Sequence, residues 1–315
     1  MIILGIESTA HTFGIGIINH KGEILANAFS SYTSKDQGMV PDKVAEHHQT
    51  VAELILKKAF TTSNLSWKDI SFIAYSAGPG LDPALWVGYK KAQEWSVKHK
   101  KKLVGVNHCC AHLSIGKLWN KLKDPVYLYV SGVNTQVVVY ENKKYRIMGE
   151  TLDIGLGNML DKLGRILGLG FPAGKEIEQL AKKGEYIPLP YVVKGMDVSF
   201  SGILTKTQQL YEKKIVKENL CFSVQETCFA MLAEVSERAL AHTGKKELLL
   251  VGGVGANQRL GQMLNIMCQE RGAKFYTVPL DLAGDQGAMI AWEGYLRRKE
   301  FKDLQVNPNW RIDEV

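Results

Sequence analysis

Residues 2–18 read IILGIESTAHTFGIGII, and residues 127–140 read YLYVSGVNTQVVVY. Each stretch is an apolar run, a polar turn and a second apolar run, the pattern of two buried strands joined by a turn. The two turns, Glu7–Ala10 and Gly132–Thr135, both carry hydroxyl side chains. Because the same unit occurs twice, the sequence indicates two related halves that face each other across a cleft.

Strands and helices alternate around this repeated unit. We expect further strands at 23–29, 70–75, 103–106 and 247–251. Apolar spacing predicts helices at 44–60 and 85–98, another from about residue 258, a last one over 286–299, and amphipathic helical stretches within 151–181. Residues 30–43 are polar and are predicted to be a loop. This alternation is typical of an α/β architecture.

The composition is that of a globular protein with a basic surface. Of 315 residues, 45% are hydrophobic, and the formal net charge of +7 suits a phosphate-rich partner or, equally, a solvated lysine-rich surface. The five cysteines form no C-x-x-C pair, which argues against a disulfide framework. The N-terminus lacks a basic signal region, and no apolar run reaches membrane-spanning length. We therefore expect a cytoplasmic protein with no membrane contact.

Three polar turns each follow an apolar strand, at Glu7–Ala10, Gly132–Thr135 and Gly252–Asn257. Turns of this kind direct backbone N–H groups and hydroxyls at one point, which suits phosphate oxygens. Neither G-x-x-x-x-G-K-[ST] nor a strand-linked G-x-G-x-x-G occurs. One such turn alone is usually only a turn, but the repeated unit and a third glycine turn together favour nucleotide binding.

The segment 151–181 supplies two acids, Asp161 and Glu178, and a Pro-Ala-Gly turn that ends at Gly174. An acid beside a bound nucleotide commonly accepts hydrogen bonds from ribose hydroxyls. The alternative is that both acids are ordinary charges on helix surfaces.

Residues 106–112 read VNHCCAH, with His108 and His112 four positions apart. On a helix this spacing places both imidazoles on one face, where they can share a metal ion. Cys109 and Cys110 are rotated away by about 100° and 200°, so we expect packed thiols rather than ligands. Two such histidines are also often plain polar helix residues. A zinc protease helix would need glutamate where Cys109 stands, which excludes that class.

A metal site needs a third ligand. Asp285, an isolated acid at a glycine turn before a predicted helix, is the best candidate. Tyr129, on the strand before the Gly132 turn, is a weaker one.

Nine segments occur in one order along nearly the whole chain: IEST, GPGL, NHCCAH, LYVSGVNTQ, ETLDIGLGNMLDKLGR, GFPAGKEIEQLA, DVSFSG, GGVGANQRL and GDQGAMIAW. Together they resemble the universal TsaD-like tRNA threonylcarbamoyladenosine synthases, a family once called O-sialoglycoprotein endopeptidases. The resemblance is closest to the archaeal and eukaryotic branch, the catalytic subunits of the KEOPS complex. It implies an ASKHA fold, shared with actin, hexokinase and heat-shock ATPases, with two ribonuclease H-like lobes around a nucleotide cleft. We expect these lobes at 1–113 plus 288–315 and at 114–287.

The implied reaction is metal-assisted acyl transfer to tRNA. A threonylcarbamoyl group moves from threonylcarbamoyl-AMP to the exocyclic amine of the adenosine just 3′ of the anticodon, in tRNAs reading codons that begin with A, and AMP leaves. The resemblance implies one divalent metal ion per subunit, iron first and zinc as the alternative, and an adenine nucleotide, with ATP or AMP able to stand in for the adenylate.

The resemblance also assigns residues and partners. It implies metal ligation by His108, His112 and Asp285, with Tyr129 nearby. Implied partners besides tRNA are a small kinase-like ATPase and small accessory subunits. The residues matching substrate- or nucleotide-binding positions are Ser8, Thr9, Tyr129, Asn134, Asp161, Gly174, Glu178 and Asn257.

Three segments depart from the family pattern. Val133 stands where a glycine is usual, the usual F-P-G-G-P reads Phe171-Pro-Ala-Gly-Lys175, and Gly38–Lys43 reverses the usual order of a basic and an acidic residue, with Asp42 in the basic place. We expect these three departures to alter contacts with the substrate or with a partner protein.

Two other functions are compatible with repeated phosphate-binding turns: an ASKHA-type small-molecule kinase and a non-catalytic ATP-binding scaffold. A kinase would leave the paired histidines without a role. The basic run Lys98–Lys102 could touch tRNA phosphates, although a solvated loop is the commoner outcome for such runs.

Overall fold

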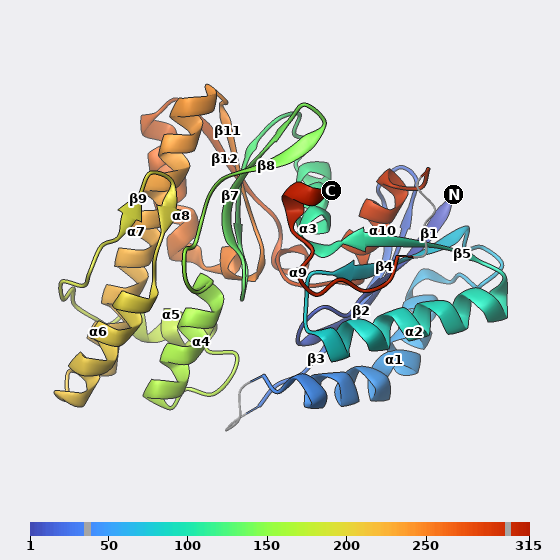
Figure 1. Cartoon of the computed structure of the whole chain (residues 1–315), viewed down its shortest axis with the longest axis horizontal. Coiled ribbons are helices and arrows are strands. Elements are labelled where there is room, and N and C mark those ends of the chain that lie inside the picture. Colours follow the sequence, from blue (N-terminus) through green and yellow to red (C-terminus); the bar gives the residue numbers. More distant parts are fainter. Residues whose placement is uncertain (35–38, 300–303) are drawn as a thin grey trace. The chain divides into compact units, whose positions relative to one another are not determined.

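The stretch at 2–18 forms two antiparallel strands, β1 (Ile2–Glu7) and β2 (Thr12–Asn19), joined by the turn at 8–11 (Figure 1). The computed structural model describes residues 1–34, 39–299 and 304–315. β1 and β2 belong to a five-stranded sheet of order β3-β2-β1-β4-β5, in which β1 pairs in parallel with β4. The other strands are β3 (Ile24–Ser31), β4 (Phe72–Gly78) and β5 (Lys102–Asn107).

The second strand–turn–strand stretch forms β6 (Val126–Val130) and β7 (Thr135–Glu141), again antiparallel. Their sheet has the order β12-β11-β6-β7-β8, with β6 parallel to β11 and β7 antiparallel to β8. Its remaining strands are β8 (Lys144–Glu150), β11 (Glu247–Val251) and β12 (Lys274–Thr277). Strand for strand, this is the order and direction of the first sheet, so the repetition in the sequence is a repetition of topology.

By their contacts, the described residues form two compact units. One comprises 1–33, 39–118 and 284–315, and the other is built on 119–283. Helix α3 (His108–Trp119) contains both residue 113, after which the sequence predicts the first division between lobes, and the end of the first unit at Leu118. The predicted lobe bounds stay a prediction.

The helices of the first unit are α1 (Pro41–Ser63), α2 (Asp82–His99), α3 and α10 (Gly287–Leu296). α1 begins earlier than predicted because Pro41 supplies a favourable first helical position. α10 lies directly on β1 and β2. A Cβ on Gly16 would come within 2.0 Å of Ala288 N, and one on Gly5 within 2.2 Å of Gly287 O. Only glycine permits this approach of helix to strand backbone.

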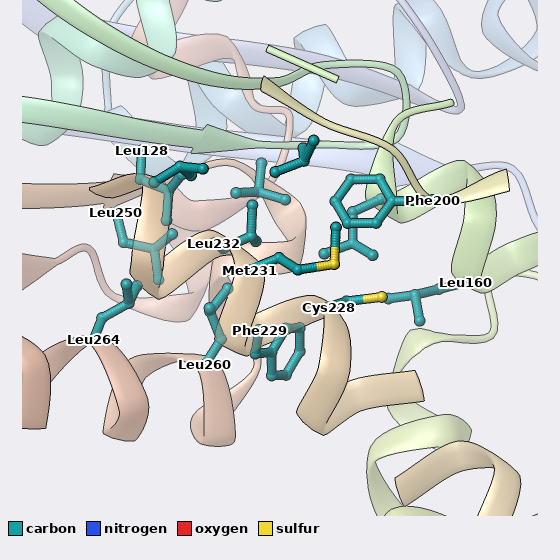
Figure 2. Close-up of a cluster of buried hydrophobic side chains, with 14 of the residues drawn as sticks. Leu128, Leu160, Phe200, Cys228, Phe229, Met231, Leu232, Leu250, Leu260 and Leu264 are labelled. Atoms are coloured by element: carbon teal, nitrogen blue, oxygen red, sulfur yellow. The ribbon is translucent and has the colours of Figure 1, made fainter. Parts of the chain in front are cut away.

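In the second unit, helices cover an extended hydrophobic core (Figure 2). Leu128 and Leu250 project from the sheet, Leu232 approaches them from a long helix, and Phe229 of the same helix lies beside Leu260, all of them buried. Its helices are α4 (Leu156–Leu167), α5 (Gly174–Ala181), α6 (Ser201–Glu212), α7 (Lys217–Thr243), α8 (Gln258–Glu270) and the short α9 (Leu280–Ala283), with a 3₁₀ turn η1 (Gly253–Ala256). A two-stranded ribbon joins β9 (Val193–Lys194) to β10 (Asp197–Val198).

The predicted loop at 30–43 includes residues 35–38, which lie outside the described residues, as does Gly38 of the departing motif. On either side, β3 extends to Ser31 and α1 begins at Pro41. The last predicted helix, 286–299, is shorter in the structure and ends at Leu296. Across the described residues, no helix combines the length and apolar character that crossing a bilayer requires.

Candidate metal centre and nucleotide-binding turns

The two histidines of VNHCCAH begin helix α3, as their spacing predicts. Asn107 ends β5 and caps the helix, because its Oδ1 accepts a hydrogen bond from Cys110 N at 3.1 Å. The cap places His108 in the first turn and His112 one turn later on the same face, with ring centroids 4.7 Å apart. Both side chains are buried, which is unusual for polar helix residues without a partner.

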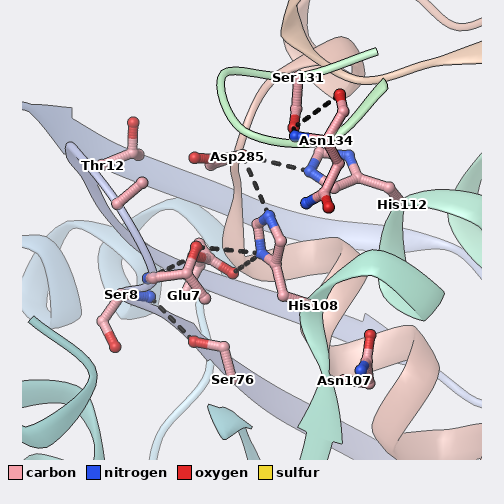
Figure 3. Close-up of polar contacts among 12 residues, drawn as sticks. Glu7, Ser8, Thr12, Ser76, Asn107, His108, His112, Ser131, Asn134 and Asp285 are labelled. Atoms are coloured by element: carbon pink, nitrogen blue, oxygen red, sulfur yellow. Dashed lines mark hydrogen bonds and ion pairs between the residues drawn. The ribbon is translucent and has the colours of Figure 1, made fainter. Parts of the chain in front are cut away.

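Asp285 reaches these histidines from the turn before α10. Its Oδ1 lies 3.2 Å from His112 Nε2 and 3.5 Å from His108 Nε2 (Figure 3). Its position follows from the close seating of α10 on β1 and β2, since Gly287 stands only two residues later. The three predicted ligands are therefore brought together in one place.

A fourth residue that the sequence did not single out, Glu7, completes this cluster. Its Oε2 accepts a hydrogen bond from His108 Nδ1 at 2.9 Å, and its Oε1 accepts from Thr9 N at 2.7 Å and Thr9 Oγ1 at 2.5 Å (Figure 3). Glu7 is fully buried. A charged residue directly at the end of an apolar strand was the available signal, because burial of an unpaired carboxylate is costly.

The hydrogen bond to Glu7 leaves His108 Nε2 facing Asp285. A carboxylate that holds the far nitrogen of an imidazole is the usual outer support of a metal-binding histidine. The ligating atoms of His108, His112 and Asp285 all lie within 4.8 Å of one another. For metal–ligand bonds of about 2.1 Å, neighbouring donors are separated by about 3.0–3.4 Å in octahedral or tetrahedral geometry. The residues present therefore fit a metal ion.

Charge within the cluster also favours a cation. Burial disfavours protonation of His108, but the Glu7 charge and hydrogen bond, together with Asp285, raise its pKa to about 9. Burial lowers the pKa of His112, although its hydrogen bond to Asp285 opposes this. Burial would raise the pKa of Asp285, but the His112 hydrogen bond and the His108 charge hold it below its usual range. The two carboxylates thus favour a positive charge at His108, and a metal ion would supply one.

Cys109 and Cys110 are packed side chains, as predicted. Both are buried, and the described cluster of ligating atoms is made of the histidines and Asp285. Burial raises the pKa of Cys110 well above its usual range, so its thiol does not supply a thiolate ligand.

The turn at 8–11 has a structural role around this cluster. Thr9 Oγ1, which donates a hydrogen bond to Glu7, also lies 3.2 Å from His108 Nδ1. Ser8 N donates a hydrogen bond to Ser76 Oγ at 3.1 Å. The Ser8 hydroxyl packs against Gly88 of α2, where an added Cβ would lie only 1.9 Å from Ser8 Oγ. Contact of Ser8 and Thr9 with phosphate stays a prediction.

In the second unit, the turn at 131–134 supports the start of α4. Ser131 N donates to Asn134 O at 2.7 Å, and Ser131 O accepts from Gly157 N at 3.0 Å. A Cβ on Gly155 would lie 2.1 Å from Val133 O, so the glycines of DIGLGN permit the helix to dock on the turn. Val133, the departure from the family pattern, is 65% exposed and is not among the residues with positive φ. Its β-branched side chain is accommodated without strain.

Tyr129 lies at the end of β6 and is fully buried. It belongs to the second unit, whereas the three metal-site residues belong to the first. Its part in metal or substrate binding stays a prediction.

The four predicted nucleoside-binding positions lie within one hydrogen-bonded region of the second unit. Asp161 Oδ1 accepts from Ala173 N, next to Gly174, and Glu178 Oε1 accepts from Gln258 N, next to Asn257, both at 2.9 Å. These bonds connect α4 to the start of α5, and α5 to the start of α8.

Both polar atoms of the Asn257 side-chain amide, Oδ1 and Nδ2, are hydrogen-bonded. Its Oδ1 caps α8 by accepting from Arg259 N and Leu260 N, and its Nδ2 donates to Gln225 Oε1 at 3.0 Å. Nearby, the Ala173 methyl occupies the space left by Gly164, where a Cβ would lie 2.1 Å from it. The alanine that departs from the family's F-P-G-G-P is thus accommodated by packing.

The repeated sheets and their connections define the class of fold. HypF of Thermococcus kodakarensis superposes with a TM-score of 0.64 over 95% of this chain and 48% of HypF, at 14% identity. Component A of the (R)-2-hydroxyglutaryl-CoA dehydratase of Acidaminococcus fermentans superposes with a TM-score of 0.58 over 95% of this chain and 99% of that protein, also at 14% identity. The chain has an ASKHA fold, as the family resemblance implies.

Within that class, sequence comparison identifies the family. The family model of the tRNA N6-adenosine threonylcarbamoyltransferases, TsaD, matches residues 23–292. The protein of that name from Thermococcus kodakarensis is 52% identical over 100% of this chain and 98% of its own length, and the one from Archaeoglobus fulgidus is 48% identical with the same coverage. A Methanocaldococcus jannaschii protein named "Probable bifunctional tRNA threonylcarbamoyladenosine biosynthesis protein" is 47% identical over 100% of this chain and 60% of its own length. The chain belongs to the TsaD family.

Proposed function

We propose that this protein is the threonylcarbamoyltransferase that its family membership indicates. It transfers the threonylcarbamoyl group of threonylcarbamoyl-AMP to the exocyclic amine of the adenosine just 3′ of the anticodon in tRNAs reading codons that begin with A. The C–O bond between carbamoyl carbon and phosphate oxygen breaks, a C–N bond to the adenine amine forms, the amine loses a proton, and AMP leaves.

The observation that carries this proposal is the buried cluster of His108, His112 and Asp285, supported by Glu7. We propose that the first three residues hold one divalent metal ion. Two imidazoles and one carboxylate with open positions are typical of iron sites, and zinc is the alternative. When bound, the metal supplies a Lewis acid and a template for the threonylcarbamoyl donor.

The chain's own residues position the reactants. Glu7 holds the His108 ring so that Nε2 faces the metal position, and the glycine-dependent seating of α10 holds Asp285 opposite it. An adenine amine is a weak nucleophile, so orientation of donor and acceptor supplies much of the rate.

The hydrogen-bonded region of Asp161, Gly174, Glu178 and Asn257 is the proposed site of the adenylate nucleoside. Its side chains are already held by bonds to backbone and to Gln225, which reduces the ordering cost of binding. We place Ser8, Thr9 and Asn134 beside the phosphate, where charge develops as AMP departs. We also propose Tyr129 near the metal-bound group.

The direct test is product formation. The protein, together with its proposed partner proteins, is incubated with unmodified tRNA, threonine, bicarbonate, ATP and an enzyme that makes the adenylate, and digested tRNA is analysed by mass spectrometry. We expect threonylcarbamoyladenosine only when the adenosine 3′ of the anticodon is present, and a tRNA with guanosine there is the substrate control. Complete reactions that yield no modified nucleoside would refute the proposal.

A pair of variants on the same helix tests the metal assignment. His108→Ala removes a proposed ligand, whereas Cys109→Ala changes its buried neighbour on another face. We expect elemental analysis to show metal lost from the first variant and retained in the second. Equal metal content in both variants would show that the ligands are elsewhere.

We also propose that the protein works with KEOPS-type partners, a small kinase-like ATPase and small accessory subunits. The name of the Methanocaldococcus jannaschii relative, which is longer than this chain and is called bifunctional, supports a companion activity. The rate of transfer measured with and without these partners tests this point, and a rate that they do not change would contradict it.

A further inference from the structure

Six basic side chains gather around the start of α7 in the second unit. We call this group the lysine surface. It comprises Arg165, Lys182, Lys183, Lys213, Lys214 and Lys217. Lys217 is partly buried and the other five are exposed.

The six residues come from three segments: the end of α4, the turn after α5, and the connection from α6 to α7. Hydrogen bonds and close packing bring these segments together. Lys217 Nζ donates to Leu167 O, which joins the start of α7 to the end of α4, two residues after Arg165. Glu185 N donates to Asn219 Oδ1 at 2.9 Å, and a Cβ on Gly184 would lie 2.1 Å from Glu218 O. The turn that carries Lys182 and Lys183 therefore packs on the first turn of α7. Figure 1 shows α4, α5, α6 and α7 as neighbours in this unit.

The charge of this surface is not neutralised within the protein. Among the residues that the structure describes, none of the six basic side chains is in an ion pair, whereas Arg238, Lys245, Arg259 and Arg271 of the same unit each pair with an acid. The acids nearest to them in sequence are Asp161, Glu185, Glu212 and Glu218, four against six basic residues, so the surface keeps an excess of positive charge. Such an excess creates a field that attracts polyanions.

The lysine surface continues from the proposed nucleoside site along the same two helices. Arg165 follows Asp161 on α4 by four residues, and Lys182 follows Glu178 at the end of α5 by four residues. Residues four apart lie on one helix face, about 6 Å along the axis. Arg165 and Lys182, at one edge of the lysine surface, thus lie one helical turn from side chains that we propose bind the adenylate.

We infer that the lysine surface binds the phosphate backbone of tRNA while the acceptor adenosine is presented for modification. This inference rests on the proposed function for the identity of the polyanion. Lysine is a flexible point charge that suits phosphates, and backbone contacts of this kind position RNA without reading its sequence. A protein partner is less suited, because interface cores are depleted in lysine and enriched in aromatic and apolar residues. Val216 and Tyr186 are the large apolar residues exposed beside the surface in the described chain.

The test compares three charge-removal variants of the full chain. Lys182→Gln, Lys183→Gln, Lys213→Gln and Lys214→Gln are combined in one quadruple variant. The double variant Lys143→Gln and Lys144→Gln removes an exposed lysine pair at the β7–β8 turn of the same unit, and it is matched by a Lys182→Gln, Lys183→Gln double variant. Fluorescence anisotropy measures affinity for an unmodified tRNA transcript across a salt series, without any threonylcarbamoyl donor.

Removing one lysine–phosphate interaction at 0.15 M salt weakens binding about four- to fivefold, so removing two weakens it about 20-fold. We expect at least this effect from the quadruple variant, with a salt slope shallower by about 1.5 or more, and no change from the 143/144 variant. The inference is overturned if the wild type does not bind tRNA, if the quadruple variant binds as the wild type does, or if both double variants reduce affinity equally. It is also overturned if tRNA affinity is unchanged but affinity for polyglutamate falls, since the surface would then serve an acidic protein.

Because no donor is present, the binding result stands apart from catalysis. Wild-type protein that binds tRNA through the lysine surface but forms no threonylcarbamoyladenosine would refute the proposed function. The same result would support the inference that this surface binds tRNA. A quadruple variant that modifies subsaturating tRNA at the wild-type rate would refute the role of the lysine surface in tRNA binding. The proposed function would be unaffected by that result.

Discussion

Replacing Gly16 by alanine tests whether the seating of α10 sets the metal site. Gly16 lies in β2, beneath the start of α10, and its added methyl would come within 2.0 Å of Ala288 N and 2.4 Å of Ala288 Cα. Backbone atoms of a strand and a helix meet here, so no flexible side chain can move aside.

The size of the effect follows from that distance. Ordinary Cβ contacts begin at 3.4 Å, so α10 would have to withdraw by about 3.4 − 2.0 = 1.4 Å. Metal–ligand distances in protein sites are held to about 0.2 Å. Asp285, just before α10, would therefore leave ligating distance of His108 and His112. Overpacking of this kind also destabilises a protein by about 1–3 kcal/mol.

Two measurements check this prediction. Urea unfolding gives the free energy of unfolding, and inductively coupled plasma mass spectrometry gives the metal content per chain. We expect Gly16→Ala to lower both. Gly261→Ala is the control, because a Cβ there meets nothing nearer than Phe275 Cε1 at 3.9 Å and helix propensity favours alanine. Wild-type metal content with a free energy of unfolding within about 0.5 kcal/mol of wild type would refute the reasoning.

Glu7→Gln keeps the shape of the side chain but removes the charge that raises the pKa of His108, so we expect metal affinity to fall about 10- to 100-fold. A chelator competition titration measures this, and an unchanged affinity would contradict the role of Glu7. His48 is buried, donates through Nε2 to Ala10 O, and has its pKa lowered by burial from 6.5 to about 4. Because the unfolded chain then binds the proton more readily, stability should be lost as pH falls from 6.5 to 4, by about 3 kcal/mol in total, and level off below. Urea unfolding over that range should show a flatter profile for His48→Gln, and parallel profiles would exclude His48 as the cause. Asn257→Ala should cost about 1 kcal/mol through loss of the α8 cap, whereas Asn257→Asp should keep the cap. Equal free energies of unfolding for these two variants would count against the capping role.

The sequence by itself determined the α/β class, the repetition of the two halves and the helical pairing of His108 with His112. These features depend on local periodicity and on residues close in the chain, which a sequence displays directly. The cap at Asn107 reinforces the same local pattern, so the histidines lie where their spacing predicts.

Only the tertiary structure decided how the cluster is completed. Glu7 and Asp285 stand 278 positions apart in sequence (285 − 7 = 278), and both reach His108. Glu7 does so because β1 and β5 flank β4 in one parallel sheet, and Asp285 because α10 returns to lie on β1 and β2. That return depends on glycines in separate segments, whose missing side chains matter only once the backbones meet. The spacing of VNHCCAH thus predicted two ligands, and the glycine turn before a predicted helix indicated Asp285 as the third. The contact between these residues, and the carboxylate of Glu7 behind His108, are set by long-range packing that no local pattern encodes.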